Sequence, residues 1–330
     1  MKNILKAFDD FNRLKILVVG DVMVDSYLRG KVSRISPEAP VPIVSLSKKE
    51  DRLGGAANVA LNLVALGVQT QMISVIGQDD AGDKLIELLK NNEIEAGSIV
   101  QSKTRRSTIK TRVLGENQHL LRVDNEDTHP ITEEEQDQMI SAVVASMDKG
   151  LDALIFEDYN KGVLTERVIQ SIIAEAQKRN ILTTVDPKLE NFFAFKGVSM
   201  FKPNLKELRE GLKCEIDMTQ FETFEKAVVE LEAILKNEIS FITLSEHGVY
   251  VKKGDDKAHI PAYIRKIADV SGAGDTVIGV ATACLAAKLS PKEMANIANL
   301  AGGLVCERSG VVAIEKDLLL EEVQRVYNGH

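Results

Sequence analysis

The sequence has few of the residues on which zinc, serine-hydrolase and disulfide chemistry depend. Its five histidines, at positions 119, 129, 247, 259 and 330, form neither a catalytic-triad pattern nor a metal-ligand spacing. Its three cysteines, Cys214, Cys284 and Cys306, are an odd number without a CxxC pair. Cys284 and Cys306 fall in apolar helical patterns, where small buried thiols are usual. Zinc and serine hydrolysis therefore have no support, and we expect reduced core cysteines.

Long hydrophobic runs and an excess of positive charge are also missing. The longest apolar run, Val277 to Ala287, is shorter than the roughly 20 residues that a transmembrane helix needs. The start, MKNILKAFDDFNRLK, is charged throughout and has no apolar signal region. A formal net charge of -8, with both signs interspersed, argues against nucleic acid or an anionic membrane as a partner. We expect a cytoplasmic protein whose basic sites are local.

Two common nucleotide-binding patterns are absent. GDVMVD, at residues 20–25, lacks the second and third glycines of GxGxxG, and GxxxxGK[ST] does not occur. A dinucleotide fold is thus disfavoured and an ordinary P-loop is excluded. The preceding run, Leu14 to Gly20, is typical of a strand buried on both faces of a parallel sheet. Asp21 and Asp25 follow it, where open α/β sheets bind ligands, although turn-forming aspartates remain the alternative.

What the chain does contain is ample material for an α/β core. It has 330 residues, of which 44% are hydrophobic, and its apolar runs alternate with amphipathic segments. We predict strands at 70–77, 151–157, 181–186 and 239–244, and helices at 83–90, 132–147 (opened by a Thr132/Glu135 capping box), 165–179, from 273 and at 291–307. Prolines at 37, 40 and 42, and a hairpin pattern over 107–124, favour extended strands there.

The strongest chemical signal lies between Asp269 and Ala281 (DVSGAGDTVIGVA), where a small-residue turn leads into an apolar helix. Gly272 and Gly274 lack a β-carbon, so the backbone turns sharply there and presents free N–H groups at the positive end of the helix. Such an end attracts phosphate. Asp275 follows in the first turn, where it can take a proton from a hydroxyl nucleophile as a kinase base does. A simple helix-start charge is the alternative.

Three further motifs occur in an order that resembles the ribokinase-like (PfkB) sugar kinases. They are GGAANVALNLVALG at residues 54–67, KPNLKE at 202–207 and TLSEHG at 243–248. The resemblance covers nearly the whole chain. It implies a three-layer α/β/α domain with a mainly parallel central sheet and a small β-sheet lid. It also implies ATP and Mg²⁺ as cofactors.

Within that family, RISPEAPVPIV (34–44), EDYNKG (157–162) and VDPK (185–188) resemble the heptose 7-phosphate kinases of lipopolysaccharide core biosynthesis. The implied reaction is ATP-dependent phosphorylation of the anomeric hydroxyl of D-glycero-D-manno-heptose 7-phosphate, giving heptose 1,7-bisphosphate for ADP-heptose. Another sugar kinase, of ribokinase or fructokinase type, is the alternative within enzymes. A non-catalytic sugar sensor is the other alternative, but it would have no need for the base in the intact GAGD.

The resemblance assigns roles residue by residue. Asp275 is the base, and the turn of Gly272, Ala273 and Gly274 supplies backbone N–H groups to the transferred phosphate. Substrate binding is implied or suggested for Asp21, Asp25, Arg34, Gly54, Gly55, Asn58, Arg112 and Lys188. ATP binding is implied for Asn204, Glu207, Thr243, Ser245, Glu246, Gly248 and Asn299, with Asn204 and Glu207 organising Mg²⁺ through water. For Arg34, Arg112 and Lys188, surface or edge-strand charges remain the alternative, and for Glu207 a first-turn helix charge.

We expect one domain, 1–330, with lid strands from about 22–46 and 107–124. Exposed strand edges of such a lid can pair between subunits, so a homodimer is expected. Asp269 and the loop of Arg308 to Gly310 resemble a monovalent-cation site of the family. Many relatives continue into a nucleotidyltransferase domain, for which this sequence has no motif. Either a separate protein supplies that activity or the sequence is truncated.

Overall fold

The computed structural model describes residues 1–116, 118–263 and 265–328, which are built around an eight-stranded sheet. The strand order is β14-β13-β12-β11-β10-β9-β1-β4. Its strands are β1 (Lys15–Gly20), β4 (Gln69–Ile73), β9 (Ala153–Glu157), β10 (Leu182–Asp186), β11 (Met200–Phe201), β12 (Ile239–Thr243), β13 (Val249–Lys253) and β14 (Asp256–Ile260). All neighbouring pairs from β4 to β12 are parallel, and β13 runs antiparallel to both of its neighbours. The expected mainly parallel sheet is confirmed.

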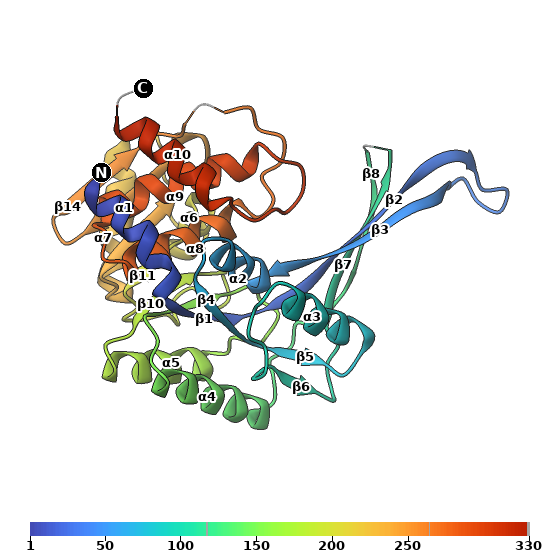
Figure 1. The fold of residues 1–330 in the computed structure, drawn as a ribbon, viewed down its shortest axis with the longest axis horizontal. Coiled ribbons are helices and arrows are strands. Elements are labelled where there is room, and N and C mark those ends of the chain that lie inside the picture. The colour runs from blue at the N-terminus through green and yellow to red at the C-terminus, as the bar shows by residue number, and fades with distance from the viewer. Residues whose placement is uncertain (117, 264, 329–330) are drawn as a thin grey trace.

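Helices cover both faces of this sheet and make three layers (Figure 1). On one face lie α1 (Lys2–Asp10), α2 (Ala56–Ala65), α3 (Asp80–Asn91), α8 (Ala273–Ala286), α9 (Pro291–Cys306) and α10 (Lys316–Tyr327). On the other lie α4 (Glu133–Asp148), α5 (Glu166–Lys178), α6 (Leu205–Leu212) and α7 (Phe221–Leu235). Strand β1 shows why two cores form: Ile16 and Val18 point to the first face, Leu17 and Val19 to the second.

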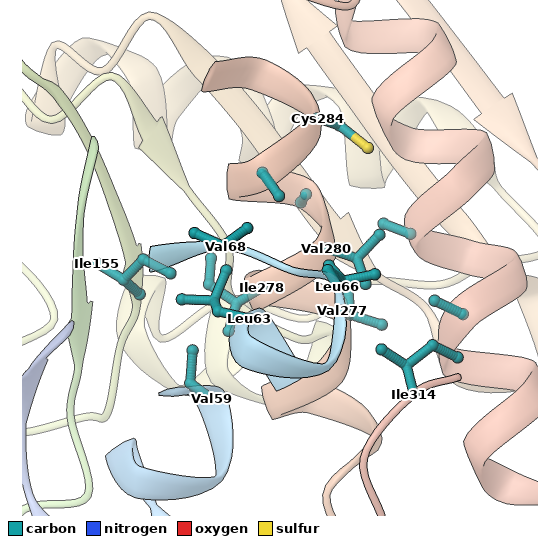
Figure 2. Packing of buried hydrophobic residues seen from close by; sticks show 14 of the residues in the cluster. Val59, Leu63, Leu66, Val68, Ile155, Val277, Ile278, Val280, Cys284 and Ile314 are labelled. Atoms are coloured by element: carbon teal, nitrogen blue, oxygen red, sulfur yellow. The ribbon is translucent and has the colours of Figure 1, made fainter. Parts of the chain in front are cut away.

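The packing of α2 against α8 positions the turn that carries Asp275. Figure 2 shows Val59 and Leu63 of α2 among Val277, Ile278 and Val280 of α8. Gly279 of α8 faces Val59 across the contact, since a β-carbon there would lie 3.6 Å from the Val59 carbonyl oxygen. Close-packed helices of this kind hold their ends rigidly, so a residue in the first turn of α8 has a well-defined position.

A second, four-stranded sheet projects from the body as the lid (Figure 1). It is formed by β2 (Val22–Ile35), β3 (Pro42–Gly55), β7 (Thr108–Gly115) and β8 (Gln118–Asn125), in the order β3-β2-β7-β8. The pair β2–β7 is parallel and the other two pairs are antiparallel. Strand β3 extends well beyond residue 46, where the sequence prediction ended. Its charged segment pairs with β2, with Arg52 opposite Asp25 and Glu50 opposite Tyr27.

The predicted single core strand over 70–77 is wrong. The chain leaves the main sheet after β4, and β5 (Val75–Gly77) pairs instead with β6 (Val100–Ser102) in a separate two-stranded sheet. At the break, the buried hydroxyl of Ser74 donates a hydrogen bond to the carbonyl oxygen of Gly20 at 2.6 Å. A run of apolar residues does not reveal this change of pairing partner.

The remaining elements are the short 3-10 turns η1 (Phe11–Arg13) and η2 (Ser245–His247). The three cysteines are free, Cys284 buried in α8 and the other two half-buried. In the part of the chain that the structure describes, no helix combines the length and the apolar character that crossing a membrane requires.

Candidate active site

The start of α8 is open toward solvent and has no side-chain cap. Gly272 adopts a left-handed conformation with φ +79°, and a β-carbon there would lie 2.9 Å from Asn58 Nδ2, so glycine is required. The N–H groups of Gly274 and Asp275 donate to no other described residue, and that of Ala273 makes one long bond of 3.3 Å to Val270. Free amides at a helix N-terminus, with Gly274 exposed, form an anion-binding end.

Asp275 lies buried directly behind this end, with 6% of its surface exposed. Asn58 Nδ2 donates to its Oδ2 at 2.7 Å, and the Tyr159 hydroxyl donates to its Oδ1 at 2.7 Å. Burial raises the pKa of Asp275 to about 6, and the two hydrogen bonds act in the opposite direction by stabilising the carboxylate. The group is therefore largely ionised at neutral pH yet basic enough to accept a proton, as a general base must.

Asn58 belongs to α2 and is fully buried. Asn62, one turn later, donates to the Asn58 carbonyl oxygen at 2.9 Å and accepts from the Thr276 hydroxyl at 3.0 Å. These bonds link α2 to the first turn of α8 at the level of Asp275. The amide of Asn58 is thereby held in the orientation that donates to the carboxylate.

The segment 157–163 brings Tyr159 to the site, and Asp21 holds that segment in place. One oxygen of Asp21 accepts from the N–H groups of Tyr159 and Lys161 at 2.8 and 3.2 Å, and the other from Val163 at 3.2 Å. Burial raises the pKa of Asp21, and these N–H groups counter that effect. The role in sugar binding expected for Asp21 stays a prediction, and the structure adds a loop-positioning role.

Asp25 stands on the lid strand β2, where it forms an ion pair with Arg112 of β7. Gly54 allows β3 to pass beside it, because a β-carbon at Gly54 would lie 2.4 Å from Asp25 Oδ2. Gly55 then turns the chain into α2 with φ +58°. Of the expected substrate residues, Asp25 thus contacts both Arg112 and Gly54 at the base of the lid.

Two ion pairs lie near Asp275, and one of them is almost fully buried. Lys202 Nζ contacts Asp186 Oδ2 at 2.8 Å, and both side chains are almost fully buried. Lys188 Nζ contacts Glu207 Oε1 at 2.6 Å and lies 5.5 Å from the centre of the Tyr159 ring. The charge of Asp186 raises the pKa of Asp275, whereas that of Lys202 lowers it.

Among the residues expected on the nucleotide side, Asn204 follows β11 and Thr243 is the last residue of β12. Asn204 and Glu207 form a reciprocal capping box at the start of α6, with both hydrogen bonds at 2.8 Å. The backbones of Thr243 and Asn204 form an isolated parallel β-bridge. Gly248 packs closely against Ile260, because a β-carbon on Gly248 would lie 2.1 Å from the Ile260 carbonyl oxygen. The side-chain amide of Asn299 donates to the carbonyl oxygen of Pro261 at 2.9 Å. Ser245 and Glu246 are exposed in η2 beside them.

The pattern of the pfkB family of carbohydrate kinases matches residues 13–317. The chain belongs to this family. It is 41% identical over 309 residues to the bifunctional protein HldE of Methylobacillus flagellatus and 37% identical over 312 residues to HldE of Sulfurimonas denitrificans. These matches cover 94% of this chain but 63% and 64% of the two relatives, so the chain spans less than two thirds of their length.

Solved structures confirm the ribokinase-like fold of this pfkB kinase. Phosphofructokinase-2 from Escherichia coli in complex with potassium has a TM-score of 0.78 at 21% identity, covering 95% of this chain and 99% of that one. Arabidopsis thaliana ribokinase complexed with ribose and ATP has a TM-score of 0.72 at 15% identity, covering 94% and 99%. As a pfkB carbohydrate kinase, the protein is a phosphotransferase that acts on an alcohol group.

Two further expected features of this pfkB kinase lie on the lid and in the C-terminal loops. Arg34 is exposed on the outer part of β2, away from the base of the lid. Asp269 joins the two C-terminal loops by accepting from the N–H of Ser271 and of Gly310, each at 2.9 Å. The predicted roles of both, in substrate binding and in a monovalent-cation site, stay predictions.

Tyr159, Lys202 and Glu157 lie at the site although their residue types and spacing alone did not predict a role for them. Glu157 is 1% exposed, its Oε2 has no hydrogen-bond partner among the described residues, and burial raises its pKa well above the usual value. Tyr159, Lys202 and Glu157 belong to the motifs EDYNKG and KPNLKE, whose resemblance to the family implies no role for these three residues. The sequence signal that could have indicated these residues is a set of charged residues at or directly after the ends of strands. In a parallel sheet, such residues come together at the carboxyl edge of the sheet.

Proposed function

We propose that this pfkB kinase transfers the γ-phosphate of ATP to the anomeric hydroxyl of D-glycero-D-manno-heptose 7-phosphate, forming heptose 1,7-bisphosphate for ADP-heptose and lipopolysaccharide core synthesis. The motifs at 34–44, 157–162 and 185–188 support the choice of sugar, as does the similarity to HldE proteins. The observation that carries the proposal is the buried carboxylate of Asp275, with a pKa of about 6, beside free helix amides.

In this reaction Asp275 accepts the hydroxyl proton while the sugar oxygen attacks the γ-phosphorus. The bond from that phosphorus to the bridging oxygen breaks, and ADP leaves with the electron pair. The N–H groups of Gly274 and Asp275 face the charge that builds up on the transferred group. Loss of one such donor typically lowers turnover by about 10²–10³-fold, so the open end of α8 contributes substantially.

Asn204 and Glu207 fit a magnesium ion held through water better than one bound directly. Their side-chain oxygens already accept hydrogen bonds in the capping box. Among the described residues, no three His, Cys, Asp or Glu side chains converge as metal ligands. Magnesium commonly retains several waters and, bound with ATP, neutralises phosphate charge. We also propose that Asp269 and the loop of Arg308 to Gly310 hold a monovalent cation.

The test of the reaction is Asp275→Asn, assayed with MgATP and a panel of sugars and sugar phosphates. We expect turnover to fall by about 10²–10⁴-fold, because general-base catalysis is lost, while ATP affinity is retained. Asp317→Asn is the matched control, since Asp317 also lies in the first turn of a helix but is exposed. Near-normal turnover of Asp275→Asn would show that Asp275 is not the catalytic base. Equal rates with unphosphorylated ribose or fructose would favour a kinase of those sugars.

We further propose that the lid pairs with a second copy of the chain. Leu46, Leu121 and Val123 are 59%, 58% and 51% exposed on the lid strands, which supports a contact surface there. A tetrameric form is described for the related phosphofructokinase-2. We expect Leu121→Glu to lower the mass measured by sedimentation velocity from dimer to monomer, with Leu5→Glu, exposed on α1, as control. An unchanged dimer in Leu121→Glu would place the contact elsewhere.

A further inference from the structure

The part of segment 157–163 that follows β9 forms neither a helix nor a strand, so its backbone depends on other groups for hydrogen bonds. Asp21 accepts from three of its N–H groups, one of which is that of Lys161. The carbonyl oxygen of Lys161 accepts from the guanidinium of Arg105. The backbone of Lys161 is therefore held on two sides, its N–H by a carboxylate and its carbonyl oxygen by a guanidinium.

Arg105 is a buried arginine of the domain body, with 8% of its surface exposed, and it lies shortly before lid strand β7. Its Nη2 donates to the carbonyl oxygen of Lys161 and, at a longer 3.4 Å, to that of Asp127. A buried guanidinium is costly unless it is hydrogen-bonded, so these carbonyl contacts determine where the side chain lies. Arg105 thus joins the segment that carries Tyr159 to the chain that follows lid strand β8.

Arg105 and Asp21 line the same small cavity, which has a volume of about 10 Å³. Arg105 Nη1 is buried and has no hydrogen-bond partner among the described residues. A cavity of this size holds about one water molecule. The charge of Arg105 also lowers the pKa of Asp21, against the effect of burial. Arg105 therefore helps to keep Asp21 in the ionised form, which accepts hydrogen bonds from the segment.

The contact at Lys161 bears on catalysis because Tyr159 lies two residues earlier. The Tyr159 hydroxyl donates to Asp275 Oδ1 at 2.7 Å, and a hydrogen bond weakens steeply when its donor is displaced or tilted. Asn160, between the two, has a left-handed backbone with φ +52°, a conformation that the surrounding contacts have to maintain. A residue that fixes Lys161 therefore also fixes the direction from which Tyr159 approaches Asp275.

We propose that Arg105 positions the Tyr159 hydroxyl against Asp275 by holding the carbonyl oxygen of Lys161. In this role Arg105 acts through Tyr159 and touches no reacting atom, so it is a positioning residue. The inference rests on the proposed function in taking Asp275 as the base, but it does not depend on which sugar is phosphorylated. Loss of Arg105 should act on catalysis through the same hydrogen bond that Tyr159→Phe removes.

The pH dependence of kcat reports this effect, because the Tyr159 hydroxyl stabilises the ionised form of Asp275. Displacing the hydroxyl raises the pKa of Asp275, so the acid limb moves to higher pH and kcat at neutral pH falls. A substitution at Arg105 leaves the other titratable side chains around this pair in place. They are Glu157, Asp186, Lys188 and Lys202.

The test combines Arg105→Met with Tyr159→Phe in a double-mutant cycle, assayed for ADP release across a pH series with whichever sugar or sugar phosphate the enzyme accepts. We expect Arg105→Met to lower kcat at pH 7 by about two- to tenfold and to move the acid limb to higher pH, with no further shift in the Tyr159→Phe background. Arg105→Lys keeps the charge and a donor, so it should recover part of kcat. Arg106→Met is the matched control, because this neighbouring arginine is exposed and paired with Asp127 at 2.7 Å.

An acid limb that does not move in Arg105→Met would overturn the proposal, as would losses of kcat that simply add in the double variant. Arg105→Gln takes the place of the methionine variant if that variant does not fold.

Hydrogen–deuterium exchange separates these outcomes from a failure of the proposed function. If Asp275→Asn keeps its turnover, the base assignment fails, and exchange of the amides of residues 159–163 then tests the hold on the segment alone. Faster exchange in Arg105→Met but not in Arg106→Met supports that hold. Equal exchange in the wild type and Arg105→Met refutes it.

Discussion

Tyr159→Phe removes the hydroxyl group that donates a hydrogen bond to Asp275 and leaves the rest of the side chain in place. The hydroxyl donates to Asp275 Oδ1 at 2.7 Å, and the aromatic ring that lies near Lys188 is retained in phenylalanine. Asn58 still donates to the other oxygen. The substitution therefore weakens the stabilisation of the carboxylate without removing it or opening a large cavity.

The size and sign of the effect follow from the pKa of Asp275. A hydrogen bond to a charged group contributes about 1.5–3 kcal/mol, and one pKa unit corresponds to about 1.4 kcal/mol. The pKa of Asp275 should rise from about 6 to about 7–8, because the ionised form loses a donor. The base acts only when ionised, so turnover falls as pH decreases through this pKa. At pH 7 we expect a loss of about two- to tenfold, with recovery near pH 9.

The measurement is kcat for ADP release across a pH series, at saturating ATP and sugar. Tyr250→Phe is the control, since its hydroxyl lies 3.5 Å from Glu225, beside α7 and outside the site. An acid limb that does not move would show that Tyr159 does not stabilise the ionised base. A loss equal at every pH would instead indicate that the hydroxyl contacts the substrate.

Two further predictions concern stability, measured by urea unfolding. Lys202→Met should lower the free energy of unfolding by about 3–5 kcal/mol, because it leaves Asp186 buried without its partner at 2.8 Å. The double variant Lys202→Met with Asp186→Leu should recover much of this loss, because no buried charge is then left unpaired. Thr282→Val should cost about 1–3 kcal/mol, because the buried hydroxyl of Thr184 loses its partner at 2.7 Å. Adding Thr184→Val should recover part of that loss, and strictly additive losses would contradict the hydrogen bond.

Much of the central sheet was predictable because its inner strands are short runs of mostly apolar or β-branched residues. The runs at 14–20, 151–157, 181–186 and 239–244 all coincide with largely buried strands that pair in parallel with at least one neighbour. The lid strand β3 was only half predicted, because Lys48, Lys49, Glu50, Asp51 and Arg52 carry charges that an exposed lid tolerates. A periodic pattern of apolar residues predicts which residues are buried. Strands that are held mainly by backbone pairing and ion pairs show little of this pattern, so it does not predict them.

The candidate site was predictable only where one short motif contains the chemistry. GAGD contains both the free amides and Asp275 within four residues. Arg105 has no such motif, because the carbonyl oxygens of Lys161 and Asp127, to which it donates, come from other segments of the chain. A solvated arginine and a buried one look alike in the sequence.

The groups around Asp275 and the side chains of the lid should have separable effects on catalysis. The base is oriented by Asn58 and Tyr159, which lie 217 and 116 positions away in the chain but belong to the rigid body of the domain. Its pKa is therefore set before the lid contacts a substrate. Arg29 and His119 belong to the lid and, together with the C-terminal loops, line a cavity of about 110 Å³. Changes to Asn58 or Tyr159 should thus shift the pH dependence of kcat, whereas changes on the lid should leave that pH dependence unchanged.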